Sequence, residues 1–224
     1  MTDISRKILN FYSQLEVDKH HRYKSWEHCY SYFCKENTEL DTACLHLSFY
    51  LASWGMYRGS SFLLWKDYLI HKEVVSYLLN NRNLQGLNIE TATEENFTEI
   101  LSLIAWVKNW YQDNIKLVKG EYRLVNVTDT LATKIILGTL GCTPAYDRYF
   151  IDGIRKKDLS YSGINSTNLK SLSQFYKNNE AQFSSLSKDI SHRSGITYPS
   201  MKLIDMYFWQ IGFENYPKLT KNEN

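Results

Sequence analysis

Apolar residues recur along this chain at intervals of three and four positions, a spacing that places them on one face of a helix. Ile4, Ile8, Phe11 and Leu15 form such a stripe near the N-terminus, and residues 26–33 begin a second one. Strand-like alternation is scarce, and the chain has only 3 Pro and 10 Gly to interrupt helices. The pattern therefore predicts an all-α fold.

Further helices are expected where such a run follows a residue that suits a helix N-terminus. Residues 41–55 are apolar on nearly every face, which predicts a central, buried helix with Asp41 as its N-cap. Thr93 is the expected N-cap of a helix at 95–115, and Pro144 suits the first position of another helix. The other helices are expected over residues 61–81, 128–140, 169–190 and 199–213.

The 224 residues are enough for a single compact unit with a sizeable core. From the positions of the polar loops, we expect two helical lobes with a cleft between them. The terminal helices, residues 1–35 and 160–224, form one lobe, and residues 36–159 form the other. The last residues, PKLTKNEN, are expected to be a frayed tail.

Charge and composition limit the classes of protein to which this chain can belong. The formal net charge is +2, so nucleic acid would be bound only through a local basic face. No apolar run approaches the roughly 18 residues that span a bilayer, and the charged N-terminus is unlike a secretory signal. Cys29, Cys34, Cys44 and Cys142 lack metal-cluster spacing and are expected to be free, buried thiols. We therefore expect a monomer in the reducing cytoplasm that does not enter membranes.

One segment, ATKIILGTLGCTPAYDR at residues 132–148, distinguishes this chain from other helical proteins. An apolar helical run ends at Gly141, a turn with Pro144 follows, and Asp147 then stands at the start of a new amphipathic segment. A helix N-terminus favours a carboxylate by about 0.3–1 kcal/mol. The layout predicts an anionic side chain at a helix N-terminus, which also suits a purely structural cap.

The order of residues in this region resembles the helix-hairpin-helix DNA glycosylases. In that superfamily a hairpin leads into a helix with a Thr-Ala pair, the helix ends at a Gly, and a loop with Pro leads to the catalytic Asp. A second segment, HLSFYLASWGMYRGSSFLLW, resembles the family's apolar helix and the wedge loop after it. The residues that match in the first segment are Thr130, Leu131, Ala132, Ile135, Ile136, Leu137, Gly141, Pro144 and Asp147.

The chain departs from the family pattern at identifiable positions. The hairpin reads Asn126-Val127-Thr128 where the family has Gly-x-Gly, whose backbone N–H groups approach a phosphate closely. Thr130 stands where bifunctional members carry the Schiff-base Lys, and the four-cysteine iron–sulfur pattern of some members is absent from the sequence. The resemblance therefore implies a monofunctional glycosylase that needs no metal or other cofactor.

Under this resemblance the partner is double-stranded DNA with a modified base, and Asp147 is the catalytic residue. Cleavage of a glycosidic bond builds positive charge on the sugar, and a carboxylate beside the anomeric carbon stabilises that charge and orients or activates water. Because duplex DNA hides its bases, an enzyme of this type flips one base out of the stack.

Neighbouring residues acquire expected roles from the same resemblance. Met56, Tyr57 and Arg58 are expected to fill the gap in the DNA stack; the alternative is that Met56 and Tyr57 pack in the core and Arg58 faces solvent. The aromatic residues expected to line the base pocket are Trp54, Tyr146 and Tyr149. The residues expected to contact the DNA backbone are Asn126, Thr128, Lys134, Arg148, Arg155, Lys156 and Lys157.

Three functions remain open on the sequence. The first is a monofunctional DNA glycosylase, acting on alkylated or deaminated bases in repair, or on bulky modified bases of invading phage DNA as an antiviral defence. The second is a non-catalytic helical nucleic-acid-binding module, which the missing hairpin glycines favour. The third is a helical protein-interaction domain, which the modest net charge and the many aromatic residues suit. Pocket shape decides which base is recognised.

Overall fold

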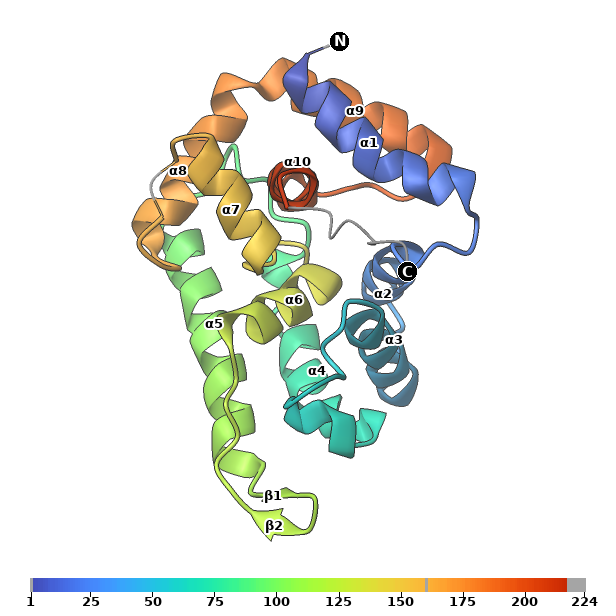
Figure 1. Cartoon of the computed structure of the whole chain (residues 1–224), viewed down its shortest axis with the longest axis vertical. Coiled ribbons are helices and arrows are strands. Elements are labelled where there is room, and N and C mark those ends of the chain that lie inside the picture. The colour runs from blue at the N-terminus through green and yellow to red at the C-terminus, as the bar shows by residue number, and fades with distance from the viewer. Residues whose placement is uncertain (1, 160, 217–224) are drawn as a thin grey trace, which may run out of the picture.

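A computed structural model describes residues 2–159 and 161–216 of the chain. The fold is predominantly helical, which confirms the all-α prediction (Figure 1). The α-helices are α1 (Asp3–Val17), α2 (Lys24–Phe33), α3 (Leu40–Ser53), α4 (Lys72–Leu79), α5 (Glu94–Asn114), α6 (Asp129–Thr139), α7 (Arg148–Lys156), α8 (Ser166–Asn178), α9 (Glu180–Ser194) and α10 (Ser200–Glu214). The short elements are the 3-10 helices η1 (Phe62–Trp65), η2 (Tyr68–His71) and η3 (Arg82–Leu84), and the antiparallel strands β1 (Leu117–Val118) and β2 (Glu121–Tyr122).

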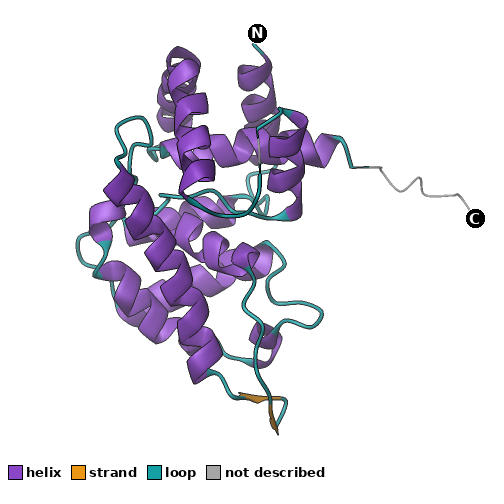
Figure 2. Cartoon of the chain, turned by 90° about the vertical axis from the view of Figure 1, so that its left-hand side faces the viewer, coloured by secondary structure: helices purple, strands orange, loops and turns teal. Residues whose placement is uncertain are grey.

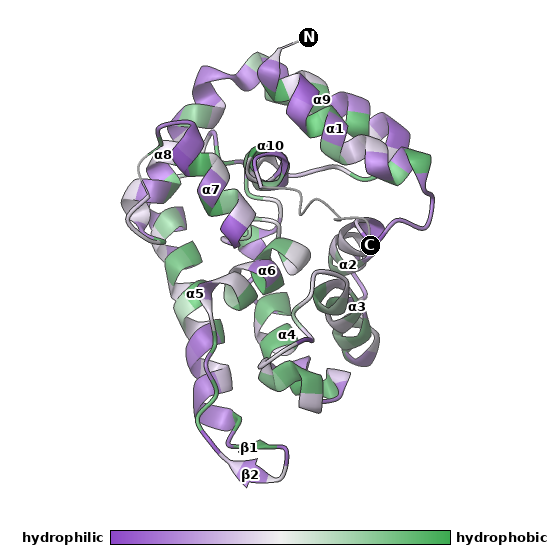
Figure 3. Cartoon of the chain, viewed as in Figure 1, coloured by the Kyte–Doolittle hydropathy of each residue, from purple (hydrophilic) through white to green (hydrophobic). Residues whose placement is uncertain are grey.

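Helix α10 is the centre of the packing. Twelve of its fifteen residues are buried, and α7, α1, α9 and α8 all pack against it. Farther down in Figure 1, α3 packs against α2, α4 and α6, and the long helix α5 packs against α6 and α8. Hydrophobic and hydrophilic residues alternate along most helices (Figure 3), and the buried residues of helices such as α1, α2, α5 and α8 recur at intervals of three and four positions, so that each helix buries one side.

The helix pairs cross the lobe boundaries that the sequence suggests. Helix α7 packs against α10, although residues 36–159 are expected to form a lobe without the C-terminal helix. Helix α2 packs against α3 and α6, although residues 1–35 are expected in the terminal lobe. Buried residues of all these helices belong to one hydrophobic core. The polar loops mark the ends of helices, while apolar faces that are distant in sequence decide which helices meet.

Several helix boundaries follow the capping residues. Thr93 forms a capping box at the start of α5, and Thr128 accepts a hydrogen bond from the third residue after it at the start of α6, as expected for N-caps. Residues 61–81 are not one helix, because Ser61 and Asp67 each accept a hydrogen bond from the backbone two residues on and start a new short turn.

Other predictions of helices need correction. No helix begins at Pro144, since α7 begins only at Arg148. Residues 169–190 fall in two helices, α8 and α9, and α3 is not buried on all sides, because Leu45 and Phe49 are exposed. The tail predicted at the C-terminus, residues 217–224, lies outside the described residues.

The four cysteines are free thiols. Cys29, Cys44 and Cys142 are buried as expected, whereas Cys34 is exposed. Among the described residues, no helix combines the length and the apolar character that crossing a membrane requires.

Two glycines allow α7 and α10 to approach each other at backbone distance. A Cβ atom at Gly153 of α7 would lie 1.9 Å from the Phe208 carbonyl oxygen, and one at Gly212 of α10 would lie 1.9 Å from the Tyr149 carbonyl oxygen. No side chain fits at either position without moving a helix. The absence of side chains at these two positions therefore determines how closely α7 lies along α10.

A buried histidine ties the loop after α3 to the helices below it. Nε2 of His71 lies 2.8 Å from the hydroxyl of Tyr57, and its Nδ1 lies 2.5 Å from the hydroxyl of Tyr111 on α5. With a partner on each ring nitrogen, a neutral imidazole uses one as donor and the other as acceptor. Burial lowers the pKa of His71 to about 3.

We expect this histidine to make the protein less stable in acid. The unfolded chain protonates His71 near pH 6.5, whereas the folded protein does so only near pH 3. Between these values the unfolded state binds the extra proton, so the free energy of unfolding falls as the pH falls, by up to about 1.4 kcal/mol per pH unit. The variant His71→Gln keeps a donor and an acceptor but does not titrate. The difference between its free energies of unfolding at pH 7 and at pH 5, measured with denaturant, should therefore be smaller than that of the wild type.

The matched control is His46→Gln, because His46 is only half-buried and stacks on Tyr32 near the surface. It should change the pH dependence less than His71→Gln does. An unchanged pH dependence in His71→Gln would contradict the assignment of a neutral, buried imidazole.

Candidate active site

The carboxylate of Asp147 lies at the N-terminus of α7, where the sequence places it. Asp147 is the N-cap residue, and its Oδ1 accepts a hydrogen bond from the backbone N–H of Phe150 (3.1 Å). An acceptor at this position satisfies one of the free N–H groups of the first helical turn. The start of the helix therefore fixes the orientation of this carboxylate.

The extended segment that precedes α7 is held from two sides. On α6, Thr130 Oγ1 donates to the Tyr146 carbonyl (2.9 Å), and Thr133 Oγ1 accepts from the Tyr146 N–H (3.0 Å). On α10, Asp205 Oδ1 accepts from the Ala145 N–H (3.1 Å). The position of the next residue in the chain is thus set by both helices.

The second oxygen of Asp147 pairs with Lys134 of α6. Nζ of Lys134 lies 2.8 Å from Oδ2, and the two side chains are only 4% and 15% exposed, respectively. The ammonium group also lies 4.9 Å from the ring centroid of Trp54, so it is stabilised by a carboxylate and by an aromatic face. This corrects the prediction that Lys134 contacts a DNA phosphate, because its charge is buried and turned toward Asp147.

Asp147 and Lys134 lie in the wall of a cavity of about 630 Å³. The wall is formed by the turn before α2, the end of α3 and the loop after it, α6, the start of α7 and the C-terminal half of α10. Its residues are Arg22, Ala52, Ser53, Trp54, Gly55, Met56, Arg58, Thr130, Lys134, Asp147, Arg148, Tyr149, Trp209 and Phe213. Asp147 is the one carboxylate in this set, whereas three exposed arginines belong to it.

The cavity brings together much of the site that the sequence predicts and adds residues that it does not. Of the predicted residues, Asp147, Trp54, Tyr149, Met56, Arg58 and Arg148 all line it. The residues that the sequence did not predict for the site are Arg22, Ala52, Ser53, Gly55, Thr130, Trp209 and Phe213. Arg22 belongs to a polar helix connection, where a charge normally meets only water. Trp209 belongs to a helix that is apolar on nearly every side, so its position on a cavity leaves no signal in the sequence.

Two aromatic residues predicted for the site lie elsewhere. Tyr146 is 1% exposed, packs against Phe150 and donates from its hydroxyl to Asn168 Oδ1 (2.6 Å), so it belongs to the core. Tyr57 is directed at His71 and does not line the cavity. The base-pocket role of Tyr146 and the wedge role of Tyr57 are corrected accordingly, because both hydroxyls find buried partners.

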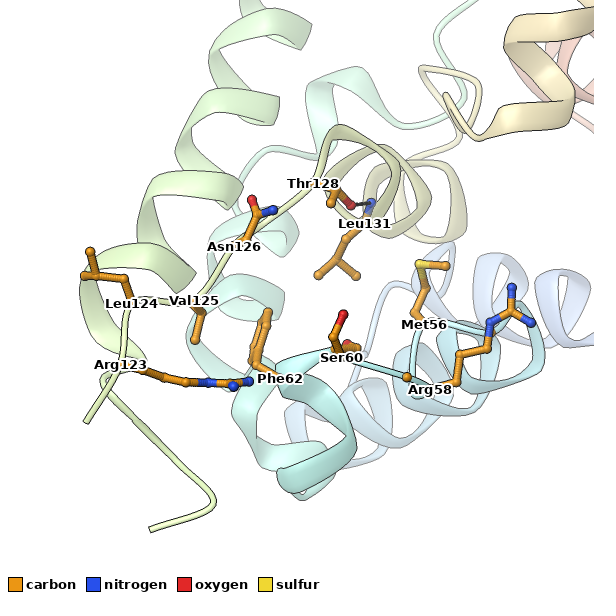
Figure 4. A pocket seen from close by; sticks show the side chains of 13 residues that line it. Met56, Arg58, Ser60, Phe62, Arg123, Leu124, Val125, Asn126, Thr128 and Leu131 are labelled. Carbon is orange, nitrogen blue, oxygen red and sulfur yellow. Dashed lines mark hydrogen bonds between the residues drawn. The ribbon is translucent and has the colours of Figure 1, made fainter. Parts of the chain in front are cut away.

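A second cavity, of about 650 Å³, lies on the other side of the loop after α3 (Figure 4). Asn126 and Thr128, two of the predicted contacts with the DNA backbone, line it. Gly55, Met56 and Arg58 line both cavities, so this loop separates them. The second cavity is lined by Gly55, Met56, Arg58, Gly59, Ser60, Ser61, Phe62, Arg123, Leu124, Val125, Asn126, Thr128 and Leu131, a set without a carboxylate.

The remaining predicted backbone contacts lie at the far end of α7. Arg155 and Lys156 line a separate surface pocket together with Asp152. Lys157 forms an ion pair with Asp3 of α1 (2.7 Å), and this pair holds the pKa of the Asp3 carboxyl well below its usual range. The structure therefore separates these three cations from Asp147, and the ion pair of Lys157 links α7 to α1.

A second buried ion pair lies behind the site. Nζ of Lys202 is 3.0 Å from Oδ2 of Asp205, and both side chains are almost fully buried. Burial lowers the pKa of Lys202, while the Asp205 carboxylate acts against this effect. Because Asp205 also holds the segment before α7, this pair supports the position of Asp147.

Within residues 2–159 and 161–216, no three His, Cys, Asp or Glu side chains lie together as metal ligands would. The site therefore consists of a carboxylate and an ammonium in contact, set in an aromatic wall with exposed arginines around it. No protein-family model, no curated protein and no solved structure matches the chain.

Proposed function

We propose that this protein is a monofunctional DNA glycosylase, which extrudes a modified base from duplex DNA and hydrolyses its N-glycosidic bond to leave an abasic site. The observation that carries the proposal is the placement of Asp147, a fixed carboxylate in the wall of a cavity of about 630 Å³. Cavities of about 300–1,000 Å³ hold small organic ligands. An extruded base therefore has room beside this carboxylate.

The wall of the cavity is rich in aromatic rings. The rings of Trp54 and Tyr149 both stand edge-on to Trp209, at centroid distances of 5.8 and 5.3 Å. Aromatic side chains offer stacking surface to any nucleobase. The exposed arginines Arg22 and Arg148 supply positive charge for the phosphates on either side of the extruded nucleotide.

The proposed reaction uses Asp147 at the sugar. The bond between C1′ and the base nitrogen breaks, and its electron pair leaves with the base. The carboxylate stabilises the positive charge that develops on the sugar, water adds to C1′, and the proton that the water loses neutralises the departing base. Since Lys134 and the Phe150 N–H each use one lone pair, the carboxylate keeps further lone pairs for this work.

The loop between the two cavities supplies the side chains for the gap in the DNA stack. Met56 and Arg58 line both cavities. The hydrogen bond between the Tyr57 hydroxyl and His71 anchors the loop that carries these two residues. An apolar side chain inserted between base steps unstacks them. Met56 is the apolar wedge in this arrangement, and Arg58 provides a cation beside it.

We expect Asp147→Asn to lower base excision by at least about 100-fold, the size of effect seen when one electrostatic group at a reacting centre is removed. Asn retains a capping oxygen for α7, so the helix should still form. The assay incubates wild type and variant with duplexes carrying alkylated, deaminated or bulky modified bases, and with modified phage DNA. Mass spectrometry of the released bases measures excision.

The matched control for this assay is Asp152→Asn, which neutralises a carboxylate on the same helix outside the cavity. It should excise bases like the wild type. If the wild type retards DNA at low salt but releases no base from any substrate, the non-catalytic nucleic-acid-binding module replaces the proposal. If the wild type does not retard DNA at all, the alternative of a helical protein-interaction domain replaces the proposal.

We further expect no lyase activity, because Lys134 is the amine in the cavity wall and its charge is engaged by Asp147 and Trp54. Attack on the aldehyde of an abasic sugar needs an unprotonated amine. Borohydride added during the reaction should therefore trap no covalent complex of protein and DNA. A trapped complex that disappears in Lys134→Gln would contradict this expectation and show a bifunctional enzyme.

A further inference from the structure

A short hairpin projects from the helical body at the end of the molecule farthest from α1 and α9 (Figures 1 and 2). We call residues 116–124 the hairpin arm. Its turn has positive φ at both central residues, Lys119 (58°) and Gly120 (79°), which is the geometry of a tight two-residue hairpin turn. The sequence contains this turn as KG between LV and EY, a run too short for strand alternation to reveal.

The hairpin arm is fastened to the body. Lys66 Nζ donates to the Leu117 carbonyl (2.6 Å), and Nζ of Lys119 lies 4.2 Å from the ring centroid of Trp65. The side chain of Val118 is buried beneath the arm. These contacts hold the arm in one position relative to η1.

The outer surface of the arm mixes apolar groups with cations. Tyr122 and Leu124 are 86% and 84% exposed, although side chains of this size normally find cover. The charged residues of the arm are the cations Lys116, Lys119 and Arg123 and the carboxylate Glu121. A protein interface keeps charges out of its apolar centre, whereas here cations stand directly beside the apolar groups.

The arm is also connected to the candidate active site. Arg123 and Leu124 line the second cavity, opposite Met56 and Arg58 (Figure 4). Since Met56 and Arg58 also line the cavity of Asp147, the loop that carries them stands between the carboxylate and the cavity that the arm lines. Arg58 and Arg123 lie in the wall of the second cavity, and none of the residues that line it is acidic.

We propose that the hairpin arm is a second DNA-contacting element, which binds the duplex on one side of the extruded nucleotide. This inference rests on the proposed function. Lys119 and Arg123 contact phosphates, while Tyr122 and Leu124 lie against sugars and base edges in the minor groove, where apolar side chains are commonly inserted. Charge favours DNA over a protein partner, because the arm carries three cations against one carboxylate and the cavity beside it is lined by Arg58 and Arg123 without an acidic residue.

The test measures binding of the full chain to a duplex with one modified base, at a series of salt concentrations. Each phosphate contact contributes about 0.9 to the slope of log K against log salt. Arg123→Gln and Lys119→Gln should each flatten the slope by about that amount. Tyr122→Ala should weaken binding about tenfold or more, the effect of losing the burial of one large side chain, and leave the slope unchanged because tyrosine carries no charge.

Lys188→Gln on α9 and Val17→Ala at the end of α1 are the matched controls, since both residues are exposed far from the arm. Both should bind like the wild type. Shortening the duplex on one side of the modified base, but not on the other, should abolish the difference between wild type and Arg123→Gln.

Two failures are distinguishable in this experiment. If the wild type binds and excises while all three arm variants bind with its affinity and slope, the arm has another partner, such as a protein, and the inference is overturned alone. If the wild type neither binds DNA nor excises a base, the proposed function fails and takes the inference with it.

Discussion

The close contact of α7 with α10 is the constraint on which the candidate site depends. Gly153 and Gly212 remove the side chains that would separate the two helices. The start of α7, and with it Asp147, is therefore held beside the helix that supplies Trp209 and Phe213 to the cavity. If the two helices lay farther apart, the carboxylate of Asp147 and the aromatic side chains of α10 would not line the same cavity.

The candidate site also requires that each buried charge has a partner of opposite charge. Two ammonium groups lie near Trp54, those of Lys134 and Lys202, and each has its own carboxylate. Buried charges are tolerated when they are paired and hydrogen-bonded. Of the two carboxylates, Asp205 is buried and holds backbone, whereas Asp147 reaches the cavity. The pair of Lys202 and Asp205 is buried and holds the backbone, whereas the pair of Lys134 and Asp147 lines the cavity.

Local patterns in the sequence predicted the parts of this structure that depend on neighbouring residues. The helical class, the cap at Thr93 and the carboxylate at a helix N-terminus all depend on residues within one turn of each other. The break of residues 61–81 into short turns was missed, since Ser61 and Asp67 are compatible with helix and with turn alike.

Contacts between distant segments could not be predicted in this way. The sequence gives no indication that Lys134 meets Asp147, because both also suit a solvent-exposed position. Arg22 and Trp209 line the cavity only because of the way in which α2 and α10 pack. Tyr146 does not line it, because its hydroxyl donates to the buried side chain of Asn168. The residues near a motif in the sequence thus indicate which side chains could line a site. The packing of the helices decides which of them line the cavity and which are buried in the core.

The ion pair of Lys134 and Asp147 also constrains how this protein can diverge. Loss of the acid first leaves an ammonium group buried without a counter-charge, and loss of the base first leaves a carboxylate in the same condition. Either order passes through a less stable ancestor. The two positions are therefore coupled in their effect on stability, and we expect a relative without the carboxylate to carry a neutral residue at position 134 as well.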